Sequence, residues 1–78
     1  MMSAADKRAI DAAVASFVET YPGDVPMVDL RCYVREKTGL DISGPVLAHP
    51  LKRLGYRRDG ERKIDTCPGK TVFYTRRP

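Results

Sequence analysis

The apolar residues of this chain recur at helical spacing as far as Leu54, and that spacing stops at Gly55. After this glycine, β-branched and aromatic residues gather in residues 70–75, a composition typical of a strand. Helices therefore come first and strands last, so we predict an α+β fold. With 78 residues the chain forms one domain, residues 1–78, and it has little room for a deep active-site pocket as well as a core.

A stripe of apolar side chains predicts the first helix. Ser3 is suited to the N-cap position, and Asp6 follows where a carboxylate meets the positive end of the helix dipole. The helix is expected to begin at about Ala4 and to end at Pro22 and Gly23. The stripe has a period of about 3.6 residues and consists of Ile10, Ala13, Val14, Phe17, Val18 and Tyr21.

Two further helices are predicted, joined by a short turn. Pro26 suits the first turn of the second helix, which Gly39 ends, and Ser43 can cap the third. Two helices that meet through a short glycine-containing turn have the sequence form of a helix-turn-helix. Pro50 removes a backbone hydrogen bond inside the third helix, so we expect a kink there, or a helix that begins near His49 after an irregular turn.

The predicted core combines apolar stripes on these two helices with tyrosines. The stripes consist of Met27, Leu30, Tyr33 and Val34 on the second helix and of Val46, Leu47, Leu51 and Leu54 on the third. We assign three tyrosines to the core or its edge rather than to a base-stacking surface: Tyr33, Tyr56 and Tyr74. Tyr33 follows the apolar stripe of the second helix, and Tyr56 comes directly after the glycine that ends the third. Cys32 is expected to pack beside its apolar neighbours as a small apolar residue.

The end of the chain is predicted to form a β-hairpin. Residues 70–75 are the best strand, and their partner is either residues 56–58 or residues 62–66. We favour a hairpin across Pro68 and Gly69, joined at its base by residues 56–58. A strand of one or two residues near Asp24 and Val25 can add to this hairpin.

Positive charge is concentrated in the C-terminal third of the chain. Residues 1–48 carry a net charge of −2, whereas residues 49–78 hold nine Lys and Arg against three Asp and Glu, a net charge of +6. This asymmetry indicates one electropositive face suited to a polyanion. A solvated basic tail is the alternative interpretation.

Three helices followed by a basic hairpin resemble the winged helix-turn-helix family, and the resemblance covers essentially the whole chain. Residues 51–58 (LKRLGYRR) are similar to the end of the third helix, and residues 69–74 (GKTVFY) to the wing, of small winged-helix domains of phages and mobile elements, including those attached to phage primases. The resemblance implies a third helix in the major groove and a wing on the adjacent backbone or minor groove. The matching positions are His49, Lys52 and Arg53 on or beside the helix, and Arg57, Arg58, Arg62, Lys63 and Lys70 in the wing.

The chemistry of these residues suits DNA binding. Solvation of the charges and protection of the hairpin edge are alternative explanations for the same residues. Lys52 and Arg53 project away from the leucine stripe of the third helix, and an arginine there can reach guanine with two hydrogen bonds, whereas a lysine brings a point charge. Two solvated charges would give the same pattern. Residues 57–63 contain four positive charges, those of Arg57, Arg58, Arg62 and Lys63. These charges can bind phosphate or protect an edge strand, and the two roles do not exclude each other.

Metal binding and catalysis have little support in the sequence. Cys32, Cys67 and His49 lack the spacing of a zinc site, and a single histidine without a glycine-rich phosphate loop or a Ser/His/Asp grouping supports no mechanism. We therefore expect no cofactor, no metal and no enzymatic activity. The chain shows no export signal and no apolar run of membrane-spanning length, so we expect a cytoplasmic protein with reduced thiols and no membrane contact.

The leading functional hypothesis is non-enzymatic binding of double-stranded DNA by a regulator or accessory factor of a phage or mobile element. The alternative is a small interaction protein, such as a phage-encoded inhibitor or adaptor, which sets the same basic face against an acidic protein surface or the nucleic-acid groove of a host complex. A single module of this size buries little surface, so tight binding would need a homodimer, tandem copies or a larger complex.

Overall fold

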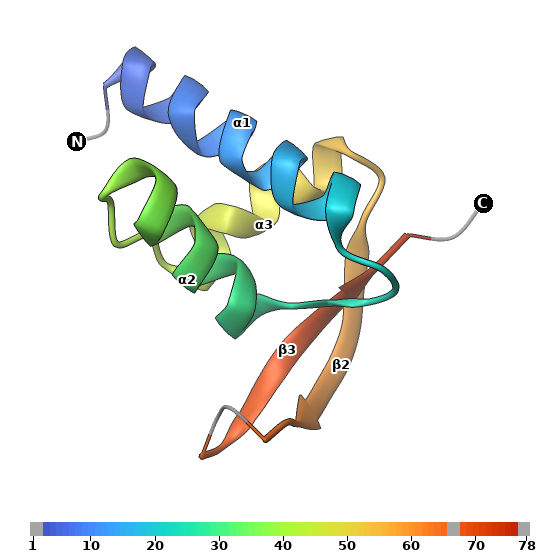
Figure 1. The fold of residues 1–78 in the computed structure, drawn as a ribbon. Coiled ribbons are helices and arrows are strands. Elements are labelled where there is room, and N and C mark those ends of the chain that lie inside the picture. Colours follow the sequence, from blue (N-terminus) through green and yellow to red (C-terminus); the bar gives the residue numbers. More distant parts are fainter. Residues whose placement is uncertain (1–2, 66–67, 77–78) are drawn as a thin grey trace.

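A computed structural model describes residues 3–65 and 68–76, in which three helices are combined with a three-stranded antiparallel sheet. In chain order the elements are α1 (Ala4–Thr20), β1 (Val25–Pro26), α2 (Met27–Thr38), α3 (Gly44–Arg53), β2 (Arg57–Lys63) and β3 (Lys70–Thr75). The helices group together, and the β2–β3 hairpin extends beyond them (Figure 1). The predicted α+β class is confirmed.

Helix α1 agrees with its prediction at both ends. The Asp6 amide donates a hydrogen bond of 3.1 Å to the Ser3 hydroxyl, which caps the helix, and Tyr21 is the C-cap. The predicted stripe faces the core, with four residues buried and the last two packed against its edge. Phe17 stacks on Tyr21 with ring centroids 4.8 Å apart and meets Tyr33 of α2 edge-on at 5.3 Å.

Helices α2 and α3 form the predicted pair around a short turn. Gly39 ends α2 with a positive φ of 75°, a conformation that glycine adopts without steric cost. Arg31 holds the turn, because its Nε donates to the Ile42 carbonyl at 3.0 Å and its Nη2 contacts the Asp41 carboxylate at 3.3 Å. Ser43 occupies the N-cap position of α3, although its side chain makes no capping hydrogen bond.

Pro50 lies within a continuous α3, so the alternative of a helix beginning near His49 is wrong, while the kink at Pro50 stays a prediction. The proline deprives only the Val46 carbonyl of its helical partner. Val46 itself lies at the surface of the helix, 38% exposed. Pro50 itself is buried, and this packing helps to offset the lost hydrogen bond.

Two predictions for the core residues are also wrong. Val46 and Leu54 of α3 are exposed, because the helix buries a narrower face centred on Leu47, Ala48 and Leu51. Cys32 is exposed as well. It lies two residues from both Leu30 and Val34, and a step of two residues along a helix leads to roughly the opposite side. Cys67 lies outside the described residues.

The sheet has the order β1–β3–β2, and β2 includes part of both predicted partners of β3, residues 57–58 and 62–63. Tyr56, Ile64 and Asp65 lie outside the strand. Residues 57–63 form one strand rather than two alternatives, interrupted by a register shift between Arg58 and Glu61. Gly60 has a φ of 77° at this bulge. The short strand expected near Asp24 and Val25 is β1, in which Val25 pairs with Tyr74 of β3.

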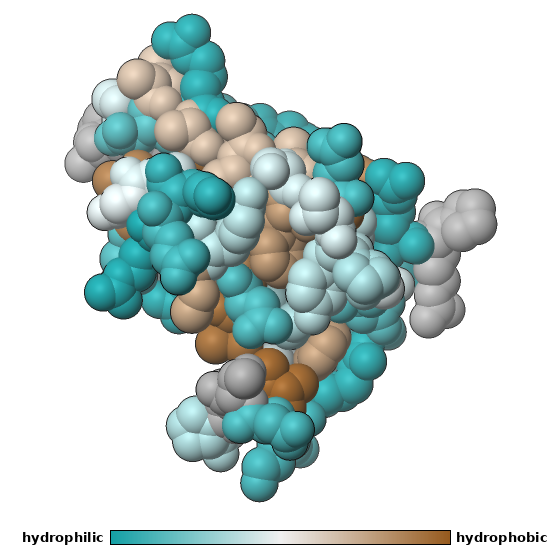
Figure 2. Space-filling view, viewed as in Figure 1, coloured by the Kyte–Doolittle hydropathy of each residue, from teal (hydrophilic) through white to brown (hydrophobic). Residues whose placement is uncertain are grey.

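The core lies between the helices and the sheet face that carries Val25 and Tyr74. Its fully buried side chains are Leu30, Leu47, Leu51, Val14, Val25 and Val34. Tyr74 is buried, whereas Tyr33 and Tyr56 pack against the core from its edge, which confirms their assignment as core or core-edge residues. Apolar side chains gather between the helices and the strands, and hydrophilic side chains cover most of the remaining face in this view (Figure 2).

Candidate nucleic-acid interface

The exposed face of α3 carries the three cationic or polar residues assigned to it. His49, Lys52 and Arg53 are all exposed, while Leu47 and Leu51 on the opposite side are buried. Helix geometry accounts for this arrangement, because at about 100° per residue His49, Lys52 and Arg53 fall on the side of α3 opposite the buried face. The helix therefore presents polar side chains to any ligand that approaches it from solvent.

Arg53 is not free, because it contacts α1. Its Nη2 lies 3.2 Å from Oδ1 of Asp11, and the two side chains are 55% and 38% exposed. An ion pair this exposed contributes little to stability, typically about 0–1 kcal/mol. The guanidinium has five N–H donors, so Arg53 retains donors for a second partner. Sequence reasoning did not identify Asp11, which lies 42 residues earlier in the chain.

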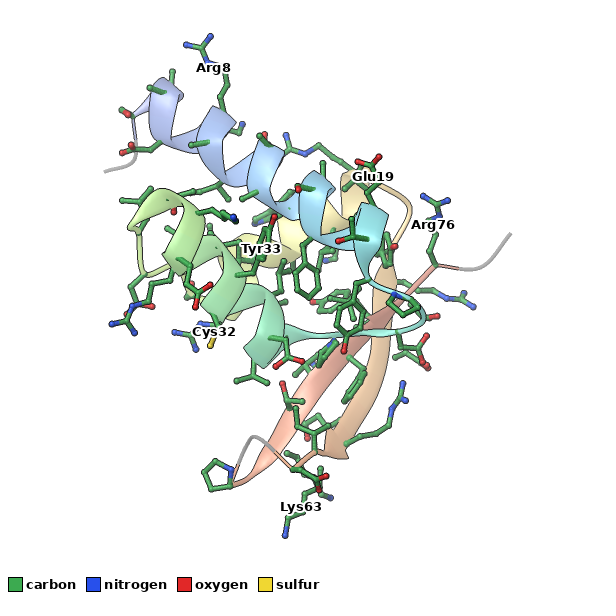
Figure 3. The ribbon with its side chains drawn as sticks, viewed as in Figure 1. Arg8, Glu19, Cys32, Tyr33, Lys63 and Arg76 are labelled. Carbon is green, nitrogen blue, oxygen red and sulfur yellow. The ribbon has the colours of Figure 1, made fainter. Side chains whose placement is uncertain are left out.

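The tip of the hairpin brings two lysines together. Lys63 of β2 and Lys70 of β3 are directly opposite each other in the antiparallel register, and both are exposed. Directly opposed residues in such a pair have Cβ atoms roughly 4.5–5.5 Å apart, so like charges there repel. Lys63 projects from the far end of the hairpin, away from the helices (Figure 3). The two opposed lysines form a small cationic site.

The register divides the remaining wing cations between the two faces of the sheet. Arg58 pairs with Tyr74 and so shares the sheet face of Lys63 and Lys70, which is the face that enters the core further along β3. Its Nη2 lies 3.4 Å from the Glu61 carboxylate. Arg57 pairs with Thr75 and points to the other face. The predicted wing residues therefore do not form one continuous basic surface.

Arg62 has several partners and lies on the same face as Arg57. Its Nη2 lies 2.7 Å from Oδ2 of Asp24 in the loop before β1 and 3.5 Å from Oδ2 of Asp59. Its guanidinium also lies 4.0 Å from the ring centroid of Phe73, a cation–π contact. These contacts tie β2 to the α1–β1 loop and cover Phe73. The structure thus gives Arg62 a structural role that the spacing of charges in the sequence did not reveal.

The described ranges, residues 3–65 and 68–76, contain no group of three or more His, Cys, Asp or Glu side chains that could hold a metal ion. Within the same ranges, no helix combines the length and apolar character needed to cross a membrane. The expectation that His49 and Cys32 bind no metal stays a prediction.

Comparison with protein-family models, with curated proteins and with solved structures finds no match to this chain. Function is therefore inferred from the geometry of the chain itself.

Proposed function

We propose that this chain is a winged helix-turn-helix domain that binds double-stranded DNA and catalyses no reaction. In this proposal α2 and α3 are the helix pair, α3 enters the major groove, and β2 and β3 form the wing on the adjacent backbone. The order of the elements and the short turn held by Arg31 are compatible with this architecture. The likeness to winged-helix domains of phages and mobile elements is the basis for a regulatory or accessory role in the cytoplasm.

The observation that carries the proposal is the pair of lysines at the hairpin tip. Lys63 directly opposite Lys70 does not stabilise the strand pair, because like charges in that position repel. An anion between them would convert this repulsion into two attractive contacts. A DNA phosphate supplies such an anion on a regular backbone, and a wing that projects from the helices can reach it (Figure 1).

The exposed residues of α3 supply a second contact. Lys52 makes no ion pair within the described part of the chain and is suited to phosphate. For Arg53, leaving Asp11 costs about 0–1 kcal/mol at this exposure, whereas a bidentate contact with guanine contributes about 1–3 kcal/mol of base discrimination. The cost of leaving Asp11 is therefore small beside the base discrimination that the contact provides. We expect Lys52 to position the helix and Arg53 to read a base.

Tight specific binding would require more than one copy of the domain. A single small DNA-binding module buries about 600–1,000 Å² of protein surface, less than the assemblies that bind their sites most tightly. We therefore propose that the chain acts as a homodimer on DNA or as part of a larger complex.

The experiment is a titration of the full chain with a labelled random-sequence duplex between about 50 and 200 mM salt. We expect affinity to fall steeply with salt. Lys52→Gln should flatten the slope of log K against log salt by about 0.9, the contribution of one phosphate contact. Arg8→Gln is the matched control, because it removes the same charge from an exposed position on α1 that projects outward, away from the other elements (Figure 3).

Absence of duplex binding by the parent chain at the lowest salt would refute the proposal. The basic face would then be assigned to an acidic protein surface or to the nucleic-acid groove of a host complex. Equal changes in slope for Lys52→Gln and Arg8→Gln would show that binding follows net charge and not the α3 face.

A further inference from the structure

A groove runs between the N-terminal half of α1 and α3, on a part of the surface that the wing does not reach. It has a volume of about 800 Å³ and is open to solvent. Residues 3–11 of α1 form one wall and residues 46–53 of α3 form the other. Each wall is about two helical turns long, since a helix rises about 1.5 Å per residue. We call this feature the α1–α3 groove.

The floor of the groove is apolar and incompletely covered. Ile10, Val46 and Pro50 line it together with Ala4. Val46 is 38% exposed, and among the residues that the structure describes Leu54 is the only other large apolar side chain with comparable exposure, at 37%. Ile10 and Pro50 are buried, so the apolar surface that the groove presents to solvent comes from Val46 and Ala4.

The rim of the groove is cationic on both walls. Lys7 stands on the α1 wall, and Lys52 and Arg53 stand on the α3 wall beside His49. Among the described residues that line the groove, only Asp11 is acidic, and its carboxylate is already in contact with Arg53. The lining therefore carries three full positive charges and one negative charge.

We infer that the α1–α3 groove binds an acidic amphipathic helix of a partner protein. A helix laid in a groove between two helices presents apolar residues to the floor at spacings of three and four, and its acidic residues would meet the rim. The charge of the rim and the length of the walls suit such a helix of two to three turns. This binding does not depend on the DNA-binding proposal, although both would use Lys52 and Arg53, so we expect the helix and DNA to compete.

Other occupants fit the groove less well. A second copy placed symmetrically would bring Lys7 and Lys52 of the two chains toward each other, and like charges would oppose the contact. DNA phosphates could use the rim, but the apolar floor offers them no favourable contact. Only an occupant that combines apolar and acidic groups uses both parts of the groove.

The test uses a labelled synthetic helical peptide with leucines at positions i, i+3, i+4 and i+7 and glutamates elsewhere. The full chain should bind this peptide at least about tenfold more tightly than a scrambled peptide of the same composition or an analogue with lysines for glutamates. Val46→Gln tests the floor and Lys7→Glu tests the rim, and each should weaken binding by at least about fivefold, a loss typical of one central contact. Arg8→Glu is the control, because it makes the same change of charge on an exposed neighbour of Lys7 that projects to solvent (Figure 3).

Val46 and Lys7 are exposed, so we expect both substitutions to leave the fold intact. Circular dichroism of each variant measures whether the helices are retained. Amide chemical shifts on peptide addition should change in residues 3–11 and 46–53. Equal affinity for the scrambled peptide, or an equal effect of Arg8→Glu and Lys7→Glu, would overturn the inference. So would a loss of duplex affinity in Val46→Gln as large as its loss of peptide affinity, because the groove would then belong to the DNA surface.

Discussion

The two lysines at the hairpin tip allow stability and binding to be separated in one variant. Replacing Lys63 and Lys70 together by Gln removes a like-charge pair from directly opposed positions of β2 and β3. Cross-strand pairs contribute roughly 0.2–1 kcal/mol, and the lower part of that range applies because both side chains are exposed and screened by salt. We therefore expect the free energy of unfolding to rise by a few tenths of a kcal/mol.

The same variant should bind DNA less tightly. If each lysine neutralises one phosphate, losing both reduces the slope of log K against log salt by about 1.8, since one phosphate contributes about 0.9 on B-DNA. The loss should be similar on a selected site and on random duplexes, because phosphate contacts carry no base information. Stability is measured by urea unfolding followed by circular dichroism, and binding by fluorescence anisotropy of a labelled duplex over the salt series.

The opposite signs of the two changes make the reasoning refutable. A variant that is less stable than the parent would show that these lysines support the hairpin, so that the pair is not a repulsive arrangement kept for a ligand. A more stable variant with an unchanged salt slope would remove the hairpin tip from the DNA interface. The Arg8→Gln variant removes one charge and so measures the general effect of each lost positive charge, which is counted twice for the double variant.

Three further predictions concern the core, base reading and the wing. Phe17→Ala removes a buried ring that contacts two tyrosines, and urea unfolding should show a loss of about 3–5 kcal/mol; a midpoint equal to that of the parent would contradict the packing of α1. Arg53→Ala should reduce the preference for a selected site by about 1–3 kcal/mol in competition binding and affect random duplex less, whereas equal losses would assign Arg53 to the backbone. Arg62→Gln should lower the thermal midpoint, because it uncovers Phe73 and releases the loop before β1, while leaving the salt slope unchanged. Arg57→Gln, on the same strand without such contacts in the described residues, should leave the midpoint near that of the parent, and equal midpoints for the two variants would remove the structural role of Arg62.

Elements defined by local patterns were predicted closely. The bounds of α1 follow from Ser3 and the apolar stripe, and β3 coincides with residues 70–75. The end of α2 at Gly39 follows from the conformational freedom of glycine. In each case the signal lies within a few residues of the feature, so no knowledge of distant segments was needed.

The wrong predictions for Pro50 and for the buried face of α3 have a different physical cause, because both depend on the packing of distant segments. Pro50 has a local cost, but its neighbours in the core determine whether the helix continues, and the buried ring stays in α3. Val46 and Leu54 belong to the apolar pattern of α3, yet how wide a face is buried depends on where α1 and α2 lie. Cys32 could have been placed correctly from helical geometry alone, because it lies two residues from the buried positions of α2.

The candidate site shows the same division between local and long-range information. Sequence alone determined that the C-terminal third is basic and that the exposed face of α3 carries Lys52 and Arg53, because charge and helical period are local properties. Only the tertiary structure decided which cations are engaged. Arg53 meets Asp11 and Arg62 meets Asp24 across 42 and 38 residues of chain, and the β2–β3 register sets Lys63 opposite Lys70. Those contacts depend on how separate elements pack, and packing minimises the exposed apolar surface of the whole chain rather than of any one segment.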